Sequence, residues 1–339
     1  MKAAVYRRYG PPEVVRIEEV EKPVPGEGEV LIAIRAAALN PLDTHFMKGR
    51  PYIARLAFGL TGPKRTRPGV DAAGLVEAVG PGVTRFKPGD AVFGLCPGAL
   101  AEYGCAPETK LALKPAGLSF AEAAAIPLAG LTALQGLRDA GRIAPGEKLL
   151  VNGAAGGIGT FAVQLGKAFG AEVTAVCGAR NGALVRALGA DRAIDYASED
   201  FTRGGERWDL IFDLVQGRGF GACRRVLAPA GRLVAGGILA APARPSLLWM
   251  ARWGARILAG MLRSRLGRQK LVFFVTKSRA EDLAELAALA EAGTVRPAID
   301  RSYPLADAVA ALRHLATGHA RGKIVVVTGP AEPAAALLR

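Results

Sequence analysis

A glycine cluster directly after a short apolar stretch constrains the fold of this chain more than any other feature. Residues 148–152 read as a buried strand, and an apolar helical pattern starts within a few residues of it. Missing side chains let a backbone turn tightly against a pyrophosphate, while the amino end of a helix offers free N–H groups. A second strand follows at 172–177, so the stretch predicts a dinucleotide-binding βαβ unit. Ala154 replaces the usual first glycine of the fingerprint, which leaves a purely structural glycine turn as the alternative. The predicted cofactor contacts in this loop are Ala155, Gly156, Gly157, Ile158 and Gly159.

The end of the second strand indicates which dinucleotide is bound. An Asp or Glu there would bind the ribose hydroxyls of NAD, but the chain continues through Cys177, Gly178, Ala179, Arg180 and Asn181. Arg180 offers a fixed charge and forked donors to a 2′-phosphate, so NADPH is the predicted cofactor. Gly178, Arg180 and Asn181 are predicted to contact it. The alternative is that Arg180 is a solvated loop charge.

The pattern of predicted strands and helices changes twice along the chain. The first 120 residues contain short β-like runs separated by Pro and Gly, as in a barrel-like β domain. From there strands alternate with Ala-rich helices, which is typical of βαβ units on a parallel sheet, and short strands return after residue 295. We therefore expect an α/β protein with a β-rich domain, residues 1–122 and 296–339. A Rossmann-fold, doubly wound parallel sheet is expected at 123–295.

Composition and charge limit the possible binding partners and the cellular compartment but do not identify the fold. The 339 residues carry a net charge of +14, which favours binding to nucleic acid, anionic membranes or phosphorylated ligands. Arg-rich codon usage explains that charge equally well, so nucleic-acid binding is not expected. The four cysteines are scattered without a CxxC pair, which argues against disulfides and thiolate zinc and indicates a reducing cytoplasm. No signal sequence or membrane span is expected.

The segment 244–270 combines two Trp and two Met with several Arg. An amphipathic helix on a membrane surface would have this composition. The favoured interpretation is a helix whose apolar side packs on the protein, in a lid-like position over a pocket.

Several motifs in this order resemble the medium-chain dehydrogenase/reductase superfamily, in its quinone oxidoreductase and enoyl reductase branch. The matching stretches cover nearly the whole chain: LNPLDTHFMKG at 39–49, PGVDAAGLVEAVGPGVTRFKPGDAVFG at 68–94, AAAIPLAGLTALQGL at 123–137, the AAGGIG loop, LGADRAIDY at 188–196 and HARGKIVV at 319–326. The resemblance implies a GroES-like β domain that carries both chain ends, a Rossmann domain between them, and an active site in the cleft.

The zinc-dependent branch of that superfamily needs ligands that this chain does not have. Asn40 stands where a zinc-binding cysteine would be, Val70 where a histidine would be, and Pro127 near the third ligand. The structural zinc lobe is also missing, and the three histidines lie elsewhere in the sequence. No metal is therefore expected.

Without zinc, the resemblance implies direct hydride transfer from NADPH to a quinone or to an α,β-unsaturated carbonyl. Asn40 and Thr132 would lie near the nicotinamide or substrate as catalytic and cofactor-binding residues. Tyr52 would stack on a quinone or donate a hydrogen bond to its oxygen. The alternatives are a turn cap for Asn40, a helix-packing role for Thr132 and an ordinary half-buried tyrosine. Asp43 is expected to orient its loop.

The remaining site residues also follow from the resemblance. Lys323 would brace the cofactor from the β domain, the alternative being a plain lysine at a strand edge. Phe274 and Val275 would offer backbone contacts to the carboxamide and pair with a second subunit, which predicts a homodimer. Further cofactor contacts are expected from Tyr196 and Gly236. The competing functions are an enoyl or enone reductase on the same fold, or an NADPH-binding protein with a nucleic-acid-binding or sensing role.

Overall fold

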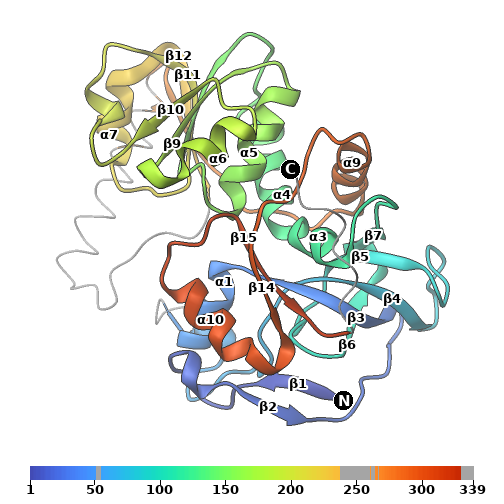
Figure 1. The fold of residues 1–339 in the computed structure, drawn as a ribbon. Coiled ribbons are helices and arrows are strands. Elements are labelled where there is room, and N and C mark those ends of the chain that lie inside the picture. Colours follow the sequence, from blue (N-terminus) through green and yellow to red (C-terminus); the bar gives the residue numbers. More distant parts are fainter. Residues whose placement is uncertain (51–54, 237–259, 261–263, 266, 330–339) are drawn as a thin grey trace. The chain divides into compact units, whose positions relative to one another are not determined.

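The computed structural model describes residues 1–50, 55–236, 260, 264–265 and 267–329, with helices and strands labelled in Figure 1. By its internal contacts the chain divides into two compact units, Met1–Leu131 with Lys277–Arg339, and Thr132–Thr276. The division falls inside helix α4 (Pro127–Gln135). Helix α9 (Ala280–Glu291) packs against strand β7 (Leu111–Leu113) and is grouped with the first unit, whereas its sequence suggested the nucleotide-binding domain.

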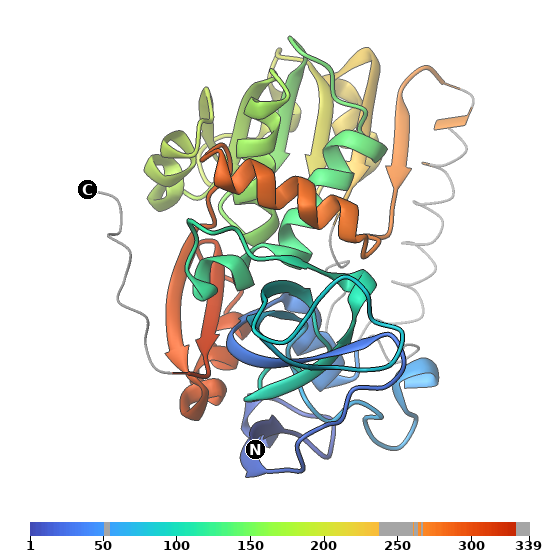
Figure 2. The same cartoon turned by 90° about the vertical axis from the view of Figure 1, so that its right-hand side faces the viewer.

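The unit Thr132–Thr276 is built on a parallel sheet. Its elements are β8 (Lys148–Asn152), α5 (Gly157–Ala168), β9 (Glu172–Cys177), α6 (Gly182–Ala187), β10 (Arg192–Asp195), β11 (Trp208–Asp213), α7 (Gly219–Cys223), β12 (Leu227–Ala235) and β13 (Lys270–Phe273). Among the described residues six strands pair in the order β10-β9-β8-β11-β12-β13, all in parallel, and run side by side in Figure 2. This order is that of the Rossmann fold and reverses between β8 and β11, where such folds bind ligands. The predicted doubly wound sheet is confirmed.

Hydrophobic runs without alternation explain why these strands lie in the middle of the unit. Leu149, Leu150 and Val151 of β8 are fully buried, as are Leu210 and Ile211 of β11. Strands of a parallel sheet are covered on both faces by their crossover helices, so the middle of a central strand is apolar on both faces and its polar residues lie at its ends. The buried run of β8 ends at Asn152, so the glycine loop begins directly after it.

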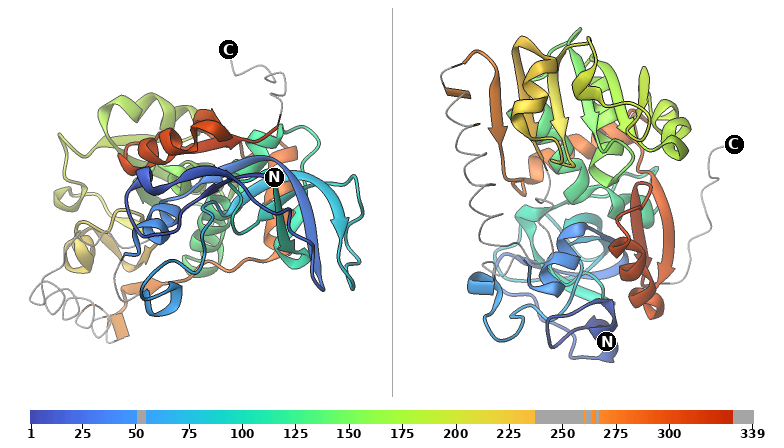
Figure 3. Two further views of the ribbon diagram at one scale, coloured as in Figure 1. Left: turned by 90° about the horizontal axis from the view of Figure 1, so that it is seen from below. Right: turned by 90° about the vertical axis from the view of Figure 1, so that its left-hand side faces the viewer.

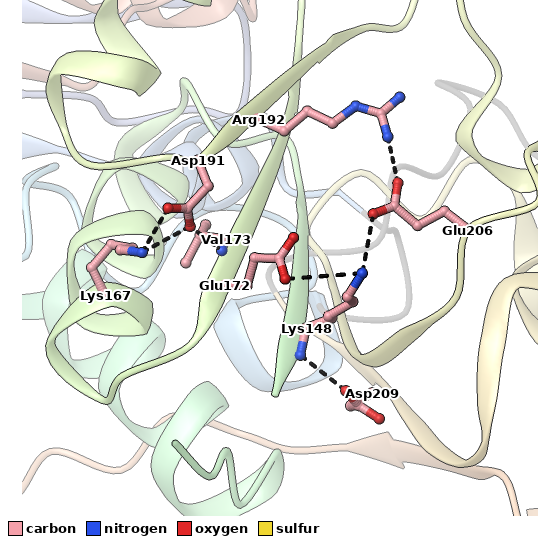
Figure 4. A network of polar contacts seen from close by, with 8 residues as sticks. All are labelled: Lys148, Lys167, Glu172, Val173, Asp191, Arg192, Glu206 and Asp209. Carbon is pink, nitrogen blue, oxygen red and sulfur yellow. Dashed lines mark hydrogen bonds and ion pairs between the residues drawn. The ribbon is translucent and has the colours of Figure 1, made fainter. Parts of the chain in front are cut away.

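Charged side chains gather at the amino ends of β8, β9 and β10 (Figure 4). Lys167 Nζ lies 2.8 Å from Asp191, whose carboxylate also accepts the Val173 N–H at 2.7 Å. Arg192 pairs with Glu206, which lies 3.8 Å from Lys148. Surface pairs of this kind contribute little singly, about 0–1 kcal/mol each. Their position leaves the opposite edge of the sheet, at the strand carboxyl ends, free of this network.

The other unit is dominated by antiparallel strands. Its elements are β1 (Lys2–Val5), β2 (Arg16–Glu19), β3 (Glu29–Leu39), α1 (Pro41–Lys48), α2 (Arg55–Phe58), β4 (Asp71–Val79), β5 (Ala91–Leu95), β6 (Tyr103–Pro107), β7, α3 (Phe120–Ala125), α9, β14 (Ile299–Pro304), α10 (Ala308–Ala316) and β15 (Lys323–Val327), with the first part of α4. In the described part of the chain the main sheet runs β14-β15-β3-β4-β5-β7, and β6 also pairs with β3. Helix α10 lies beside β14 and β15, coloured red in Figure 3.

Strand β3 organises this unit because it pairs with β4, β6 and β15. Ile324 and Val326 of β15 enter the same apolar core as Ile32 and Leu39 of β3, although nearly 300 residues separate the strands in sequence. The carboxyl-terminal strand is therefore required to complete the core that the amino-terminal strands begin, as the predicted domain with both chain ends implies.

The strand expected at 270–276 ends at Phe273, so Phe274 and Val275 lie beyond β13. Tyr52 and the segment 244–259 lie outside the described residues. Within the described residues no helix is long and apolar enough to cross a membrane.

Candidate active site

The turn between β8 and α5 is closed by its own backbone. The N–H groups of Gly153 and Ala154 both donate to Val176 O, at 3.1 and 3.0 Å, and Gly156 N–H donates to Gly153 O at 3.1 Å. Gly153 has a φ of +89°, in the region that favours glycine. A Cβ on Gly159 would lie 2.2 Å from Gly153 O, so the helix can start this close to the turn only with glycine there.

Helix α5 begins at Gly157, and its regular hydrogen bonds begin with Thr160 N–H donating to Gly156 O at 2.9 Å. The N–H groups of Gly157, Ile158 and Gly159 in the first turn have no partner inside the helix. Aligned peptide dipoles add a partial positive charge at the same place. The residues predicted to contact the pyrophosphate are thus brought together by the local fold, and the arrangement suits a negatively charged group.

The end of β9 presents the residues predicted to choose the cofactor. Arg180 is exposed in the turn after this strand. Tyr196 follows β10, is 59% exposed, and its hydroxyl would lie 3.2 Å from a Cβ on Gly178. The buried Oδ1 of Asn181 accepts no hydrogen bond within the described part of the chain. Such an unsatisfied buried oxygen is costly unless a ligand supplies a donor.

One carboxylate near this turn was missed. Asp195 ends β10 and lies in register beside Cys177 at the end of β9. Its Oδ1 accepts the Ala197 N–H at 3.1 Å, which closes a local turn after the strand. The carboxylate near this turn therefore comes from β10 rather than from β9, and it already accepts a hydrogen bond from the backbone that follows it.

The carboxyl ends of β8, β11 and β12 are joined by a second polar cluster. Asp213 Oδ1 accepts from Asn152 Nδ2 at 2.8 Å and from the backbone N–H groups of Val215 and Gln216 at 3.1 and 2.8 Å. The Gln216 amide donates in turn to Gly236 O at 3.1 Å. The predicted contact Gly236 therefore lies directly after β12, held by the half-buried Gln216, at the edge of the sheet where the glycine loop lies.

Thr132 is 5% exposed, and its hydroxyl lies 2.9 Å from the Thr276 hydroxyl. The ring of Phe274 packs against Phe212 of β11, with centroids 6.4 Å apart. Val275 is 85% exposed. Thr276 did not stand out in the sequence, because a single threonine after a strand carries no signal of its own.

In the β-rich unit, Asn40 lies at the centre of a buried network. Its Nδ2 donates to Asp71 Oδ2 at 3.0 Å, while Lys323 Nζ donates to Asn40 Oδ1 at 2.7 Å and to Asp71 Oδ2 at 3.0 Å. The three side chains come from the N-cap of α1 and the starts of β4 and β15, and each is at most 5% exposed. Lys323 is therefore not an ordinary strand-edge lysine.

Asp43 holds the backbone around this network. Its carboxylate accepts the N–H groups of Asn40 and Gly69 at 2.8 and 3.0 Å, which agrees with the expected loop-orienting role. The pKa of Asp43 is raised to about 7, mainly by its complete burial and also by the nearby Asp71 carboxylate, against the lowering effect of the two N–H donors and of Lys323.

Asp71 was not singled out in the sequence, although the signal was present. It is an acid at the start of an otherwise apolar strand, and a fully buried acid requires a partner. Asp213 has the same signature at the end of β11. Charged residues that terminate apolar runs could have identified both clusters.

These features define a class of protein. A Rossmann sheet with a glycine loop at the carboxyl end of its first strand, joined to a β-rich unit with a buried polar cluster, is typical of two-domain dinucleotide-dependent dehydrogenases and reductases.

Comparisons with known proteins identify the family. Residues 26–127 match the alcohol dehydrogenase GroES-like domain, and residues 188–326 match a zinc-binding dehydrogenase domain. A 2-methylene-furan-3-one reductase of Solanum lycopersicum is 38% identical over 96% of this chain and 79% of its own length. A chloroplastic NADPH-dependent alkenal/one oxidoreductase of Arabidopsis thaliana is 35% identical over 97% and 80%. The structure of a quinone oxidoreductase from Coxiella burnetii superposes with a TM-score of 0.83 at 31% identity, covering 97% of this chain and 99% of that one. The chain belongs to the medium-chain dehydrogenase/reductase superfamily, in its quinone oxidoreductase-like branch.

The matched domain name implies zinc, but the residues here do not fit it. The Asn40 amide faces the Lys323 ammonium, and a fixed positive charge at 2.7 Å opposes a divalent cation. Across the described residues, no group of three or more His, Cys, Asp or Glu could hold a metal ion. Zinc is bound by thiolate, imidazole and carboxylate groups, and this cluster offers one carboxylate that is already paired.

Proposed function

We propose that this protein is an NADPH-dependent oxidoreductase that transfers a hydride to a quinone or an α,β-unsaturated carbonyl without zinc. The observation that carries the proposal is the β8–α5 turn, where Gly159 packs on Gly153 and the first turn of the helix presents its N–H groups. Relatives named as quinone, alkenal/one and furanone reductases support the same acceptor class.

The residues that would hold NADPH fit the groups it carries. The N–H groups of residues 157–159 suit the pyrophosphate, and Arg180 at the end of β9 suits a 2′-phosphate. The unsatisfied Asn181 Oδ1 suits a hydroxyl or amide donor. When bound, NADPH supplies the hydride. The protein binds and orients NADPH and the acceptor, and it excludes water.

Asn40 of the β-rich unit and Thr132 of the parallel unit are each proposed to contact the nicotinamide or the substrate. Asn40 does not ionise in the working pH range and is held by charged neighbours, so it provides a hydrogen bond of fixed direction. The Thr132 hydroxyl is held by Thr276. Neither group is an acid strong enough to protonate a product, so protonation is assigned to water.

Turnover of purified protein tests the proposal directly. NADPH and NADH oxidation should be followed against quinones, enones and simple ketones, with and without a chelator. We expect NADPH-preferring turnover of quinones or enones that the chelator does not change. The ratio of the turnover rate with quinones to the turnover rate with enones ranks these two acceptor classes. NADPH binding without turnover of any acceptor would shift the function to binding or sensing.

A homodimer is also proposed, with β13 at the edge of the parallel sheet as the contact strand. Among the described strands β13 pairs only with β12, and Phe273 and Val275 are exposed at 46% and 85%. An unpaired, apolar edge strand is a template for pairing with a second chain. Light scattering of the wild-type protein and of Phe273→Glu tests this, since a charge at an exposed apolar position of the edge opposes strand pairing. Cytoplasmic location stays a prediction from cysteine usage, and the Arabidopsis relative is chloroplastic.

A further inference from the structure

Three buried side chains of the β-rich unit form a closed triangle of hydrogen bonds. Lys323 Nζ contacts Asn40 Oδ1 at 2.7 Å and Asp71 Oδ2 at 3.0 Å, and Asn40 Nδ2 contacts the same Asp71 oxygen at 3.0 Å. They are 2%, 5% and 0% exposed in the order Lys323, Asn40, Asp71. Water therefore cannot substitute easily for any of the three contacts.

The chemistry of the two charged groups fixes the orientation of the Asn40 amide. An ammonium can only donate hydrogen bonds, and an ionised carboxylate can only accept them. Turning the amide by 180° would place its NH₂ group against the ammonium of Lys323 and its oxygen against the carboxylate of Asp71. Two hydrogen bonds would become two repulsive contacts in a buried site. The oxygen and nitrogen of this amide are thus assigned by their neighbours.

The triangle is also anchored to the backbone on both sides. Asp71 Oδ1 accepts the N–H of Leu128 in the first turn of α4 at 3.1 Å, and the Asn40 N–H donates to Asp43 at 2.8 Å. The Asn40 oxygen accepts a hydrogen bond from Lys323. The second hydrogen of Asn40 Nδ2 has no partner among the residues that the structure describes.

We propose that Lys323 and Asp71 are positioning residues that make Asn40 a one-way hydrogen-bond donor, so that the acceptor must present a lone pair, as a carbonyl oxygen does. The proposal rests on the proposed function, in which Asn40 faces the acceptor. The contacts to Lys323 and Asp71 thus act as a lock on the Asn40 amide. Without this lock the amide could turn and offer either its oxygen or its NH₂ group. With the lock, its NH₂ group donates to the carbonyl oxygen of a quinone or enone and stabilises the negative charge that hydride transfer places on that oxygen.

A double-mutant cycle separates this role from a general structural one. Asn40→Ala removes the donor and should lower kcat for a quinone or enone by about 100-fold, the usual effect of deleting one oxyanion donor. Lys323→Met frees the amide and should lower kcat by at least about 10-fold, since misdirected groups lose most of their effect. If Lys323 acts through Asn40, the double variant should match Asn40→Ala within about 2-fold. Lys22→Met, an exposed charge loss in the same unit, serves as control.

The readouts distinguish the possible failures. NADPH affinity, measured by fluorescence titration, should fall less than kcat in every variant, because the backbone contacts of the glycine turn are unchanged. An unchanged kcat in Lys323→Met, or a double variant whose loss is the product of the two single losses, overturns the inference. Absence of turnover in the wild type overturns the proposed function instead.

A neutral pair keeps the test available if Lys323→Met does not fold. Asp71→Asn with Lys323→Met removes both charges together and leaves no unpaired buried ion. The amide of Asn40 is free to turn in this variant, so kcat should fall as in Lys323→Met, and NADPH affinity should fall less than kcat. Wild-type kcat in this variant contradicts the lock.

Discussion

The glycine turn of the parallel unit and the Asn40 network of the β-rich unit are built in opposite ways. The turn is made of backbone N–H groups and missing side chains within seven consecutive residues, 153–159, and carries no charged side chain. The network is made of side chains from three elements, and Lys323 lies 283 residues from Asn40. A backbone site depends on space, whereas a side-chain site in a dry interior depends on charge balance. Changes that add volume should break the first, and changes that remove a charge should break the second.

The largest expected effect is on stability in Lys323→Met. Removing one partner of a buried ion pair leaves Asp71 unpaired and should cost about 3–5 kcal/mol of the free energy of unfolding. Denaturant titration of Lys323→Met and of the neutral pair Asp71→Asn/Lys323→Met measures it. The neutral pair should recover most of the loss, and equal losses in both proteins would show that charge is not the cause.

The next largest effect is a pH dependence of the free energy of unfolding, which we expect from Asp43 beside the Asn40 network. The folded-state pKa of Asp43 is raised from 3.8 to about 7, so between these values the native protein binds a proton that the unfolded chain releases. The contribution of Asp43 to stability is full below about pH 4 and is lost as pH rises toward 7, by up to about 1.4 kcal/mol per pH unit. Subtracting the unfolding free energies of Asp43→Asn from those of wild type isolates the slope. A flat difference from pH 4 to 7 contradicts it.

Volume should matter more than charge in the glycine turn. The added Cβ of Gly159→Ala meets Gly153 O and the Ala154 backbone, and overpacking of this kind costs about 1–3 kcal/mol. We expect a lower melting temperature and weaker NADPH binding, because the helix start must move. Gly205→Ala is the matched control, since no atom lies within 4 Å of its added Cβ. Equal effects of the two variants would remove the steric explanation.

The smallest expected effect concerns an exposed charge. Arg180→Gln should weaken NADPH binding by about 10-fold, or about 1.4 kcal/mol, and leave NADH binding nearly unchanged. Arg203→Gln removes the same charge from another exposed position of the unit. Fluorescence titrations with both cofactors measure the ratio, and a parallel loss of NADH affinity would assign Arg180 a structural role.

The fold was predictable where the signal is local. The apolar run of β8, the glycines after it and the second strand at β9 place the phosphate loop without any tertiary information, and the structure has them as expected. The strand at Lys270 was predicted three residues too long, because apolar residues continue past Phe273 while the pairing with β12 stops there. Thr276 and Asp195 were missed because their roles come from neighbours that the sequence does not place beside them.

The sequence by itself determined the βαβ unit, the glycine loop and the absence of zinc ligands at Asn40 and Val70, because each depends on residue types over a short span. Only the tertiary structure decided that Lys323 is buried and paired with Asp71, and that Asn40 is held in one orientation. Such contacts arise when β15 pairs with β3 beside β4, and residue spacing along a chain carries no record of which strands will pair. Long-range pairing converts three ordinary polar residues into one fixed hydrogen-bond donor.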